Sequence, residues 1–305
     1  MPDLTTQFCG LTLKNPGLAS SGTFGYGLEL DSILDLNALG GFVVKGLSRE
    51  PIAGNKAPRV TETSSGMLNS IGLQNVGVRA FVSEKLPKLA KLDTAVFANV
   101  FGYAPEDYVE VLRVLEDAAG LAGYELNVSC PNTKHGGMQF GADPQLLGEV
   151  VGMARRAVSK RPLIVKLSPN VTDIAQMAKA AEEAGADAIS LINTVQAMAV
   201  DAKTRKPKIG AGMGGLSGPA VKPIALRMVF QAARAVKIPV IGMGGVATGE
   251  DVVEFLLCGA TAVLVGTASF WDPKSPQRIA GEMNRFLDGQ GVQAAADLVG
   301  RLEMP

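Results

Sequence analysis

The stretch that decides the fold is PVIGMGGVATGEDVVEFLLCGATAVLVGTASF, residues 239–270. It contains two short apolar runs, PVIGMGG and AVLVGTA, each of which ends in small residues and has the composition of a buried strand. Between them, TGEDVVEFLLCGA has helical spacing, opens at a threonine and closes at a glycine, which are helix start and stop signals. The stretch therefore predicts a strand, a helix and a second strand in succession.

The same alternation extends toward the N-terminus. Segments such as 105–120 and 171–186 have helical spacing and separate further strand-like runs. These runs are PGLASSG (16–22), GFVVKGL (41–47), AVFANVFG (95–102), YELNVSC (124–130), PLIVKLSP (162–169) and AISLINT (188–194). Eight strands that are apolar almost throughout, each followed by a helix, predict an α/β protein with a (β/α)8 TIM barrel. An open doubly wound sheet is the alternative.

The organisation of the chain follows from its length and from two unusual stretches. No low-complexity segment or linker divides the 305 residues, so we expect a single domain over 1–305. The stretches 46–77 and 194–220 are long and glycine-rich, and they lack the apolar periodicity of a helix or strand. We expect them to be excursions over the mouth of the barrel, where active-site loops and lids lie.

Charge and cysteine content argue against several protein classes. Lysine plus arginine and aspartate plus glutamate number 29 each, so no net field attracts nucleic acid or an anionic membrane. The first residues lack the basic, then apolar, then small-residue pattern that is typical of a leader peptide, and no long apolar run occurs in the sequence, so we expect the protein to be cytoplasmic. Cys9, Cys130 and Cys258 lie far apart without a C-x-x-C pair, which disfavours a disulfide framework, a zinc site or an iron–sulfur cluster on this chain. His135 is the only histidine and lies five residues from Cys130. It is either a solvated loop residue or the histidine of a Cys-His catalytic pair.

Polar residues cluster at the ends of the predicted strands, and in a parallel barrel these positions converge on one site. Lys45 and Lys166 end strands that are otherwise apolar. Burying them is costly unless an anion or a ligand atom meets them, although each could instead extend to solvent. The other strand-end residues are Ser20, Ser21, Asn99, Asn127, Cys130, Ser168, Asn193, Thr194, Gly244, Gly245, Gly266 and Thr267.

Glycine turns after the last two strands predict a phosphate site, because residues without a Cβ let backbone amides approach phosphate oxygens. The stretch GAGMGGLSG (210–218) lacks the preceding strand and the spacing of a dinucleotide fingerprint. We expect it to be a loop whose end, Gly218, joins the phosphate site. One phosphate, two lysines and several amide side chains suit one flavin mononucleotide (FMN) per chain, at the C-terminal ends of the strands. Lys166 would stabilise the negative charge that develops on the pyrimidine ring during reduction.

Several motifs together resemble the soluble class 1 dihydroorotate dehydrogenases. These are NSIGLQN (69–75), ELNVSCPN (125–132), LINT (191–194) and the two terminal glycine turns, and the resemblance covers essentially the whole chain. The segments ASSGTFGYG (19–27), VKGLS (44–48) and 54–75 are more similar to the class 1B catalytic subunit than to class 1A. The resemblance implies oxidation of (S)-dihydroorotate to orotate in de novo pyrimidine (UMP) biosynthesis.

In that family, hydride from C6 of the substrate passes to FMN and the proton from C5 passes to a base. The class 1 base is a cysteine that matches Cys130; a buried structural thiol is the alternative reading. Membrane-bound class 2 members have a serine there and an N-terminal membrane-associating segment, and we expect neither in this chain. Cys9 and Cys258 have no such neighbours and are expected to be structural.

The resemblance also implies roles for other residues. Substrate-holding positions match Lys45, Asn69, Ser70, Ile71, Gly72, Leu73, Asn127, Asn193 and Thr194, with Asn132 as a weaker addition. Lys45 is expected to meet the substrate carboxylate. Flavin contacts match Ser21, Lys45, Gly46, Asn99, Asn127, Lys166, Ile192, Gly218, Gly244, Gly245, Gly266 and Thr267.

The class 1B resemblance implies a partner subunit that carries FAD and a [2Fe–2S] cluster and passes electrons to NAD⁺. Two catalytic subunits would form a dimer within a heterotetramer that includes two such partners. The sequence has neither cluster ligands nor a convincing dinucleotide fingerprint, which fits this division of labour.

Three other readings stay open. They are a fumarate-dependent class 1A enzyme, a flavin barrel that reduces another pyrimidine or a dihydrouridine, and a non-catalytic phosphate-binding barrel. An enzyme that acts on dihydrouridine in tRNA would need a basic surface and aromatic side chains that stack on bases. This chain is neutral overall and has only four tyrosines and one tryptophan. A non-catalytic barrel would be colourless.

Overall fold

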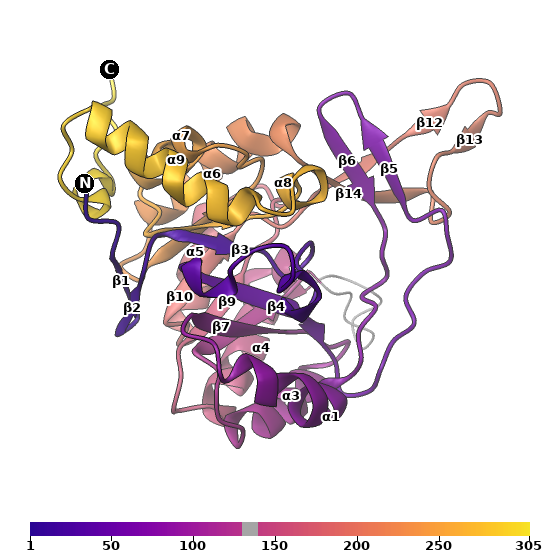
Figure 1. The fold of residues 1–305 in the computed structure, drawn as a ribbon. Helices are drawn as coiled ribbons and strands as arrows, with labels where there is room; N and C mark the ends of the chain where they lie inside the picture. Colours follow the sequence, from indigo (N-terminus) through magenta and orange to yellow (C-terminus); the bar gives the residue numbers. More distant parts are fainter. Residues whose placement is uncertain (130–139) are drawn as a thin grey trace.

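The computed structural model describes residues 1–129 and 140–305. Eight parallel strands close into a barrel in the order β10-β15-β16-β3-β4-β7-β8-β9 (Figure 1). The strands are β3 (Gly17–Ala19), β4 (Gly41–Leu47), β7 (Ala95–Val100), β8 (Gly123–Asn127), β9 (Leu163–Lys166), β10 (Ala188–Leu191), β15 (Val240–Met243) and β16 (Ala262–Val265). The last strand pairs with the first, Val263 lying opposite Gly17. This pairing confirms the predicted (β/α)8 barrel and excludes the open sheet.

Helices surround the barrel on the outside (Figure 1). The longer ones are α3 (Pro105–Glu116), α4 (Pro144–Ala157), α5 (Ile174–Glu183), α6 (Lys222–Ala233), α7 (Gly249–Leu257) and α9 (Ser275–Gly289); α1 (Val78–Ala80), α2 (Leu86–Leu89) and α8 (Ala268–Trp271) are short. The start signals act as expected: the Asp173 carboxylate accepts from the Ala175 and Gln176 amides at the start of α5. The Thr248 hydroxyl accepts from the Asp251 amide at the start of α7. None of these helices is long and apolar enough to cross a membrane, within the ranges that the structure describes.

Apolar side chains fill both the inside and the outside of the barrel wall. Phe8, from the hairpin of β1 (Thr6–Phe8) and β2 (Leu11–Leu13), packs in one buried cluster with Val43, Phe97 and Ile164 of the strands. A larger cluster lies between the strands and the helices. Each strand therefore buries both of its faces, which is why its sequence reads as a continuous apolar run.

The two glycine-rich excursions contain regular strands, although their sequences lack the apolar periodicity of a strand. β5 (Val60–Thr63), β6 (Gly66–Asn69), β11 (Val195–Met198) and β14 (Met213–Ser217) form a four-stranded antiparallel sheet in the order β11-β14-β6-β5. With the small ribbon β12 (Val200–Asp201) and β13 (Lys206–Pro207), this sheet projects to one side of the barrel (Figure 1). Residues 210–218, expected to be a loop, thus contain a strand. The sequence lacks the period of a buried element because β5, β11 and β14 contain only exposed or half-buried residues, and only Met67 and Leu68 of β6 are buried.

Candidate functional site

A cavity of about 360 Å³ lies between the barrel and the projecting sheet. Its walls come from the C-terminal ends of the barrel strands and from β6 and β14. The residues predicted to hold substrate or flavin, within the described part of the chain, all line it: Ser21, Lys45, Gly46, Asn69, Ser70, Ile71, Gly72, Leu73, Asn99, Asn127, Lys166, Ile192, Asn193, Thr194, Gly218, Gly244, Gly245, Gly266 and Thr267. Ser20 also lines it, whereas Ser168, the other strand-end residue expected at the site, is buried and does not. Cys130, Asn132 and His135 lie outside the described residues.

One end of the cavity is built from glycine turns. Gly218, Gly244 and Gly245 have φ values of 98°, 127° and 80°, a region that favours glycine. A Cβ on Gly245 would also lie 2.8 Å from Lys222 Cβ and 2.9 Å from the Gly218 carbonyl oxygen. A Cβ on Gly266 would meet only Ser20 Cβ at 3.8 Å, so this glycine leaves open space beside the cavity. Close backbone amides and open space are what a phosphate group needs.

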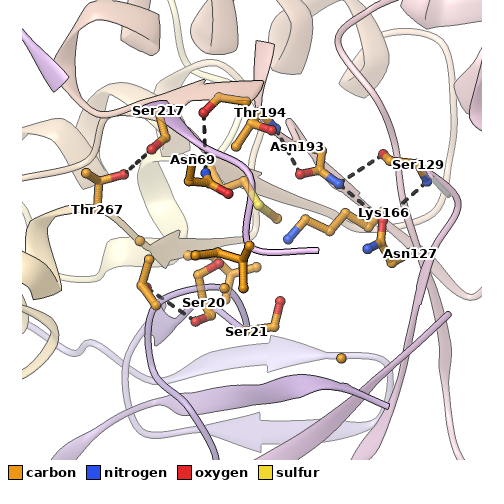
Figure 2. A pocket seen from close by; sticks show the side chains of 18 of the residues that line it. Ser20, Ser21, Asn69, Asn127, Ser129, Lys166, Asn193, Thr194, Ser217 and Thr267 are labelled. Atoms are coloured by element: carbon orange, nitrogen blue, oxygen red, sulfur yellow. Dashed lines mark hydrogen bonds between the residues drawn. The ribbon is translucent and has the colours of Figure 1, made fainter. Parts of the chain in front are cut away.

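Two hydroxyl groups complete this end. Thr267 Oγ1 donates to Ser217 Oγ at 2.8 Å, which joins the start of the segment after β16 to the end of β14. Figure 2 shows this pair on the opposite side of the cavity from Lys166 and Asn127. The cavity is therefore chemically divided, with glycines and hydroxyls at one end and an ammonium group with amides at the other.

Two lysines give the cavity a positive character. Lys166 is 6% exposed at the end of β9, and Lys45 is partly buried in β4. Burial, the Lys166 ammonium and the Arg59 guanidinium together lower the pKa of Lys45. None of the described residues that line the cavity is acidic. The arrangement therefore suits an anionic ligand, whose charge would offset these cations.

An amide network forms the wall around Asn193. Its Nδ2 donates to Asn127 Oδ1 at 3.2 Å and to Ser129 Oγ at 2.9 Å, and its Oδ1 accepts from the Thr194 amide at 2.8 Å (Figure 2). Tyr108 fixes the backbone nearby by donating to the Asn127 carbonyl at 2.8 Å. These contacts hold amide and hydroxyl groups in place, which suits a small planar ligand with carbonyl and N–H edges.

The NSIGLQN segment (69–75) forms another part of the wall and is hydrogen-bonded to the segment before β5. The Asn55 amide donates to the Ile71 carbonyl at 2.9 Å, and the Ser70 amide donates to the Arg59 carbonyl at 2.8 Å. Gly72 and Leu73 have φ values of 76° and 59°. A leucine in this region is uncommon and is kept there only by its surroundings, as often found at ligand sites.

Some residues that line the cavity were not predicted as site residues. Ser129 and Ser217 supply hydroxyl groups, and Phe270 of α8 lies at the wall while 55% exposed. Ser217 directly precedes Gly218, and this adjacency is the one signal that could have identified it. Apolar lining residues such as Met67, Phe101, Met243 and Leu264 resemble core residues in the sequence and carry no such signal.

The two other cysteines lie away from the cavity. Cys9 Sγ donates to the Asp187 carbonyl at 3.4 Å, and Cys258 is buried at the end of α7. Burial, with a smaller contribution from the Asp187 carboxylate, raises the pKa of Cys9 to about 12. Burial also raises the pKa of Cys258. Both thiols are therefore protonated at neutral pH, as structural cysteines are.

Comparison with known proteins places the chain in a family. The model of the dihydroorotate dehydrogenase family matches residues 3–287. A protein of Solibacter usitatus named "Putative dihydroorotate dehydrogenase A (fumarate)" is 69% identical over 302 residues, 99% of each chain. Proteins named "Dihydroorotate dehydrogenase B (NAD(+)), catalytic subunit" from Pelobacter propionicus and Geobacter sulfurreducens are 55% and 54% identical, again over 99% of each chain. The chain belongs to the dihydroorotate dehydrogenase family.

Proposed function

We propose that this protein oxidises (S)-dihydroorotate to orotate in de novo pyrimidine (UMP) biosynthesis, with FMN in the cavity described above. The observation that carries the proposal is the composition of that single cavity: glycine turns at one end, two lysines without an acidic lining residue in the described part, and an amide network. The turns suit the FMN phosphate, and the amides suit a substrate rimmed by carbonyl and N–H groups. Membership of the family supports the same reaction.

The residues take the following roles in this proposal. Bound FMN supplies the acceptor for the hydride from C6 of the substrate. Lys166 provides positive charge beside the flavin pyrimidine ring, and Lys45 binds the substrate carboxylate. Asn69, Ser70, Ile71, Gly72, Leu73, Asn127, Asn193 and Thr194 orient the substrate. Cys130, which lies outside the described residues, takes the proton from C5.

We further propose that the chain is the catalytic subunit of a B-type enzyme and that residues 1–305 form one catalytic domain. Two copies would join two electron-transfer subunits that carry FAD and [2Fe–2S] and pass electrons to NAD⁺, in the cytoplasm. The relatives named as catalytic subunits of the NAD(+) type support this assignment. A fumarate-dependent enzyme is the second candidate, because the 69% identical protein carries that name.

An anaerobic experiment on the purified chain tests the function. The protein should be yellow, and dihydroorotate should bleach its flavin absorbance. If the B-type assignment is right, fumarate should not reoxidise the reduced protein, and NAD⁺ should do so only after the partner subunit is added. Rapid reoxidation by fumarate would instead support the second candidate. A yellow protein that dihydroorotate does not bleach would contradict the substrate, and a colourless one would contradict the cofactor.

Substitution of the proposed base gives a second test. Cys130→Ala should retain flavin but slow its reduction by dihydroorotate at least a hundredfold, the usual range for loss of a general base. Stopped-flow absorbance measures this rate. Cys258→Ala is the control, because Cys258 lies away from the cavity, and its reduction rate should equal that of the wild type. An unchanged rate in Cys130→Ala would contradict the role of Cys130.

A further inference from the structure

A buried carboxylate lies directly behind the proposed flavin site. Glu125 in β8 is 1% exposed and does not line the cavity, although its neighbours Asn99 and Lys166 do. Asn99 Nδ2 donates to Glu125 Oε2 at 2.6 Å, and Ser190 Oγ donates to Glu125 Oε1 at 2.8 Å. Lys166 Nζ lies 3.9 Å from Glu125 Oε2. Glu125 thus contacts strands on both sides of β8.

The contact with Glu125 determines which way the Asn99 amide faces. An ionised carboxylate can only accept hydrogen bonds, so the nitrogen of the amide must point toward it. The Asn99 oxygen then points elsewhere, and a Cβ on Gly46 would lie 2.8 Å from it. Gly46 and Asn99 both line the cavity. Glu125 therefore makes Asn99 present an acceptor beside Gly46, which suits an N–H group of a ligand ring.

Glu125 also supplies the negative charge nearest to Lys166 among the ion pairs of the described residues. The cavity lining there contains two lysines and no carboxylate, so this charge acts from behind the wall. Charges interact strongly in a buried environment, where water screens them poorly. The carboxylate therefore offsets part of the positive field of Lys166 that a ligand in the cavity experiences.

We propose that Glu125 is a positioning residue that holds the Asn99 amide and lowers the reduction potential of the bound flavin by offsetting the charge of Lys166. This inference rests on the proposed function, because it requires a flavin in the cavity. A positive field favours the reduced, more negative flavin, so removing the Glu125 charge should make the flavin easier to reduce.

The Glu125→Gln variant separates charge from geometry. The glutamine oxygen can accept from Asn99 Nδ2 and its nitrogen can donate to Ser190 Oγ, so both contacts are retained while the charge is lost. In anaerobic equilibration with a reference dye, the variant should show a ratio of reduced to oxidised flavin about tenfold higher than that of the wild type. This ratio corresponds to a reduction potential about 30 mV higher, because the flavin couple transfers two electrons. The dissociation constant of FMN from the apoprotein, measured by fluorescence, should change less than threefold.

Two further variants are matched controls. Ser190→Ala removes one hydrogen bond to the same carboxylate but keeps the charge, so the ratio should change less than twofold. Glu125→Asp keeps the charge on a shorter side chain and should return the ratio toward the wild-type value. A shifted ratio in Glu125→Gln together with nearly wild-type ratios in Ser190→Ala and Glu125→Asp would support an electrostatic role. A merely structural residue would alter stability without making the reduction potential follow the charge at position 125.

The outcomes distinguish this inference from the function on which it rests. An unshifted ratio in Glu125→Gln, with wild-type flavin that dihydroorotate bleaches, would overturn the role of Glu125 alone. Failure of Glu125→Gln to fold or to bind FMN would assign the residue to stability and would overturn the inference as well. A wild-type protein without flavin would refute the proposed function and the inference together.

Discussion

Lys45 is a partly buried cation, and burial, Lys166 and Arg59 lower its pKa below the ordinary lysine value. Between that lowered pKa and 10.5, the unfolded chain binds more protons at this site than the folded protein does. The stability contribution of Lys45 in the ligand-free protein should therefore rise with pH across this window. The difference in free energy of unfolding between the wild type and Lys45→Met, measured in urea from pH 7 to pH 10, should change in that direction. A constant difference would contradict the lowered pKa.

The same residue should also govern ligand affinity. Because Lys45 is proposed to meet the substrate carboxylate, Lys45→Met should weaken orotate binding at least tenfold, about 1.4 kcal/mol. Isothermal titration calorimetry on the flavin-loaded protein measures this affinity. Lys56→Met is the matched control, since Lys56 is exposed and does not line the cavity. Equal losses in both variants would point to a general effect of charge.

At the scale of elements, the pairing of β14 with β6 holds the cavity wall in register. Gly215 lies opposite Asn69, and a Cβ at position 215 would lie 2.0 Å from Thr194 Oγ1. Gly215→Ala should therefore displace Thr194 and weaken orotate binding at least tenfold. Circular dichroism should show that the barrel of this variant is still folded. Gly210→Ala serves as control, because a Cβ there would make only ordinary contacts, 3.5 Å from the Pro58 carbonyl oxygen. Equal orotate affinity in the two variants would contradict this role of the sheet.

At the scale of the whole molecule, a buried polar network lies at the end of the barrel opposite the cavity. The Glu116 carboxylate accepts from Tyr124 Oη at 2.6 Å and from the Ser159 and Lys160 amides at 2.8 and 2.7 Å. Arg161 Nη1 lies 3.6 Å from Glu116 Oε2. Burial raises the pKa of Glu116, but these hydrogen bonds and the Arg161 charge outweigh it, and the net shift is downward. The ionised carboxylate therefore stabilises the fold.

Glu116→Gln should lower the free energy of unfolding at pH 7 by about 2 kcal/mol, the range for hydrogen bonds to a charged group. Because the folded pKa lies below the ordinary value of 4.5, the contribution is present above that pH and is lost as the pH falls through the folded pKa. Urea unfolding at pH 7 and pH 3 should show this loss, with the exposed Glu149→Gln as control. Orotate binding should stay unchanged, because in such a barrel the active-site residues lie at the C-terminal ends of the strands and residues that serve stability lie at the other end.

Much of this molecule can be derived from its sequence. The eight apolar runs predict the barrel strands because a strand buried on both faces must be apolar throughout. Residues at the ends of parallel strands must meet, so Lys45, Asn99, Asn127, Lys166 and Asn193 could be assigned to one site before their distances were known. The roles of these residues in catalysis stay predictions.

Contacts between distant segments were decided only by the tertiary structure. Asn69 and Gly215 are 146 residues apart, and the sheet that joins them has no apolar period, because its strands are held by backbone hydrogen bonds that any residue can make. Glu125 is likewise one acidic residue in an apolar run, and its partners Asn99, Lys166 and Ser190 come from three other strands. Strand periodicity depends on local residue types, whereas these contacts depend on how the closed barrel brings the strands together.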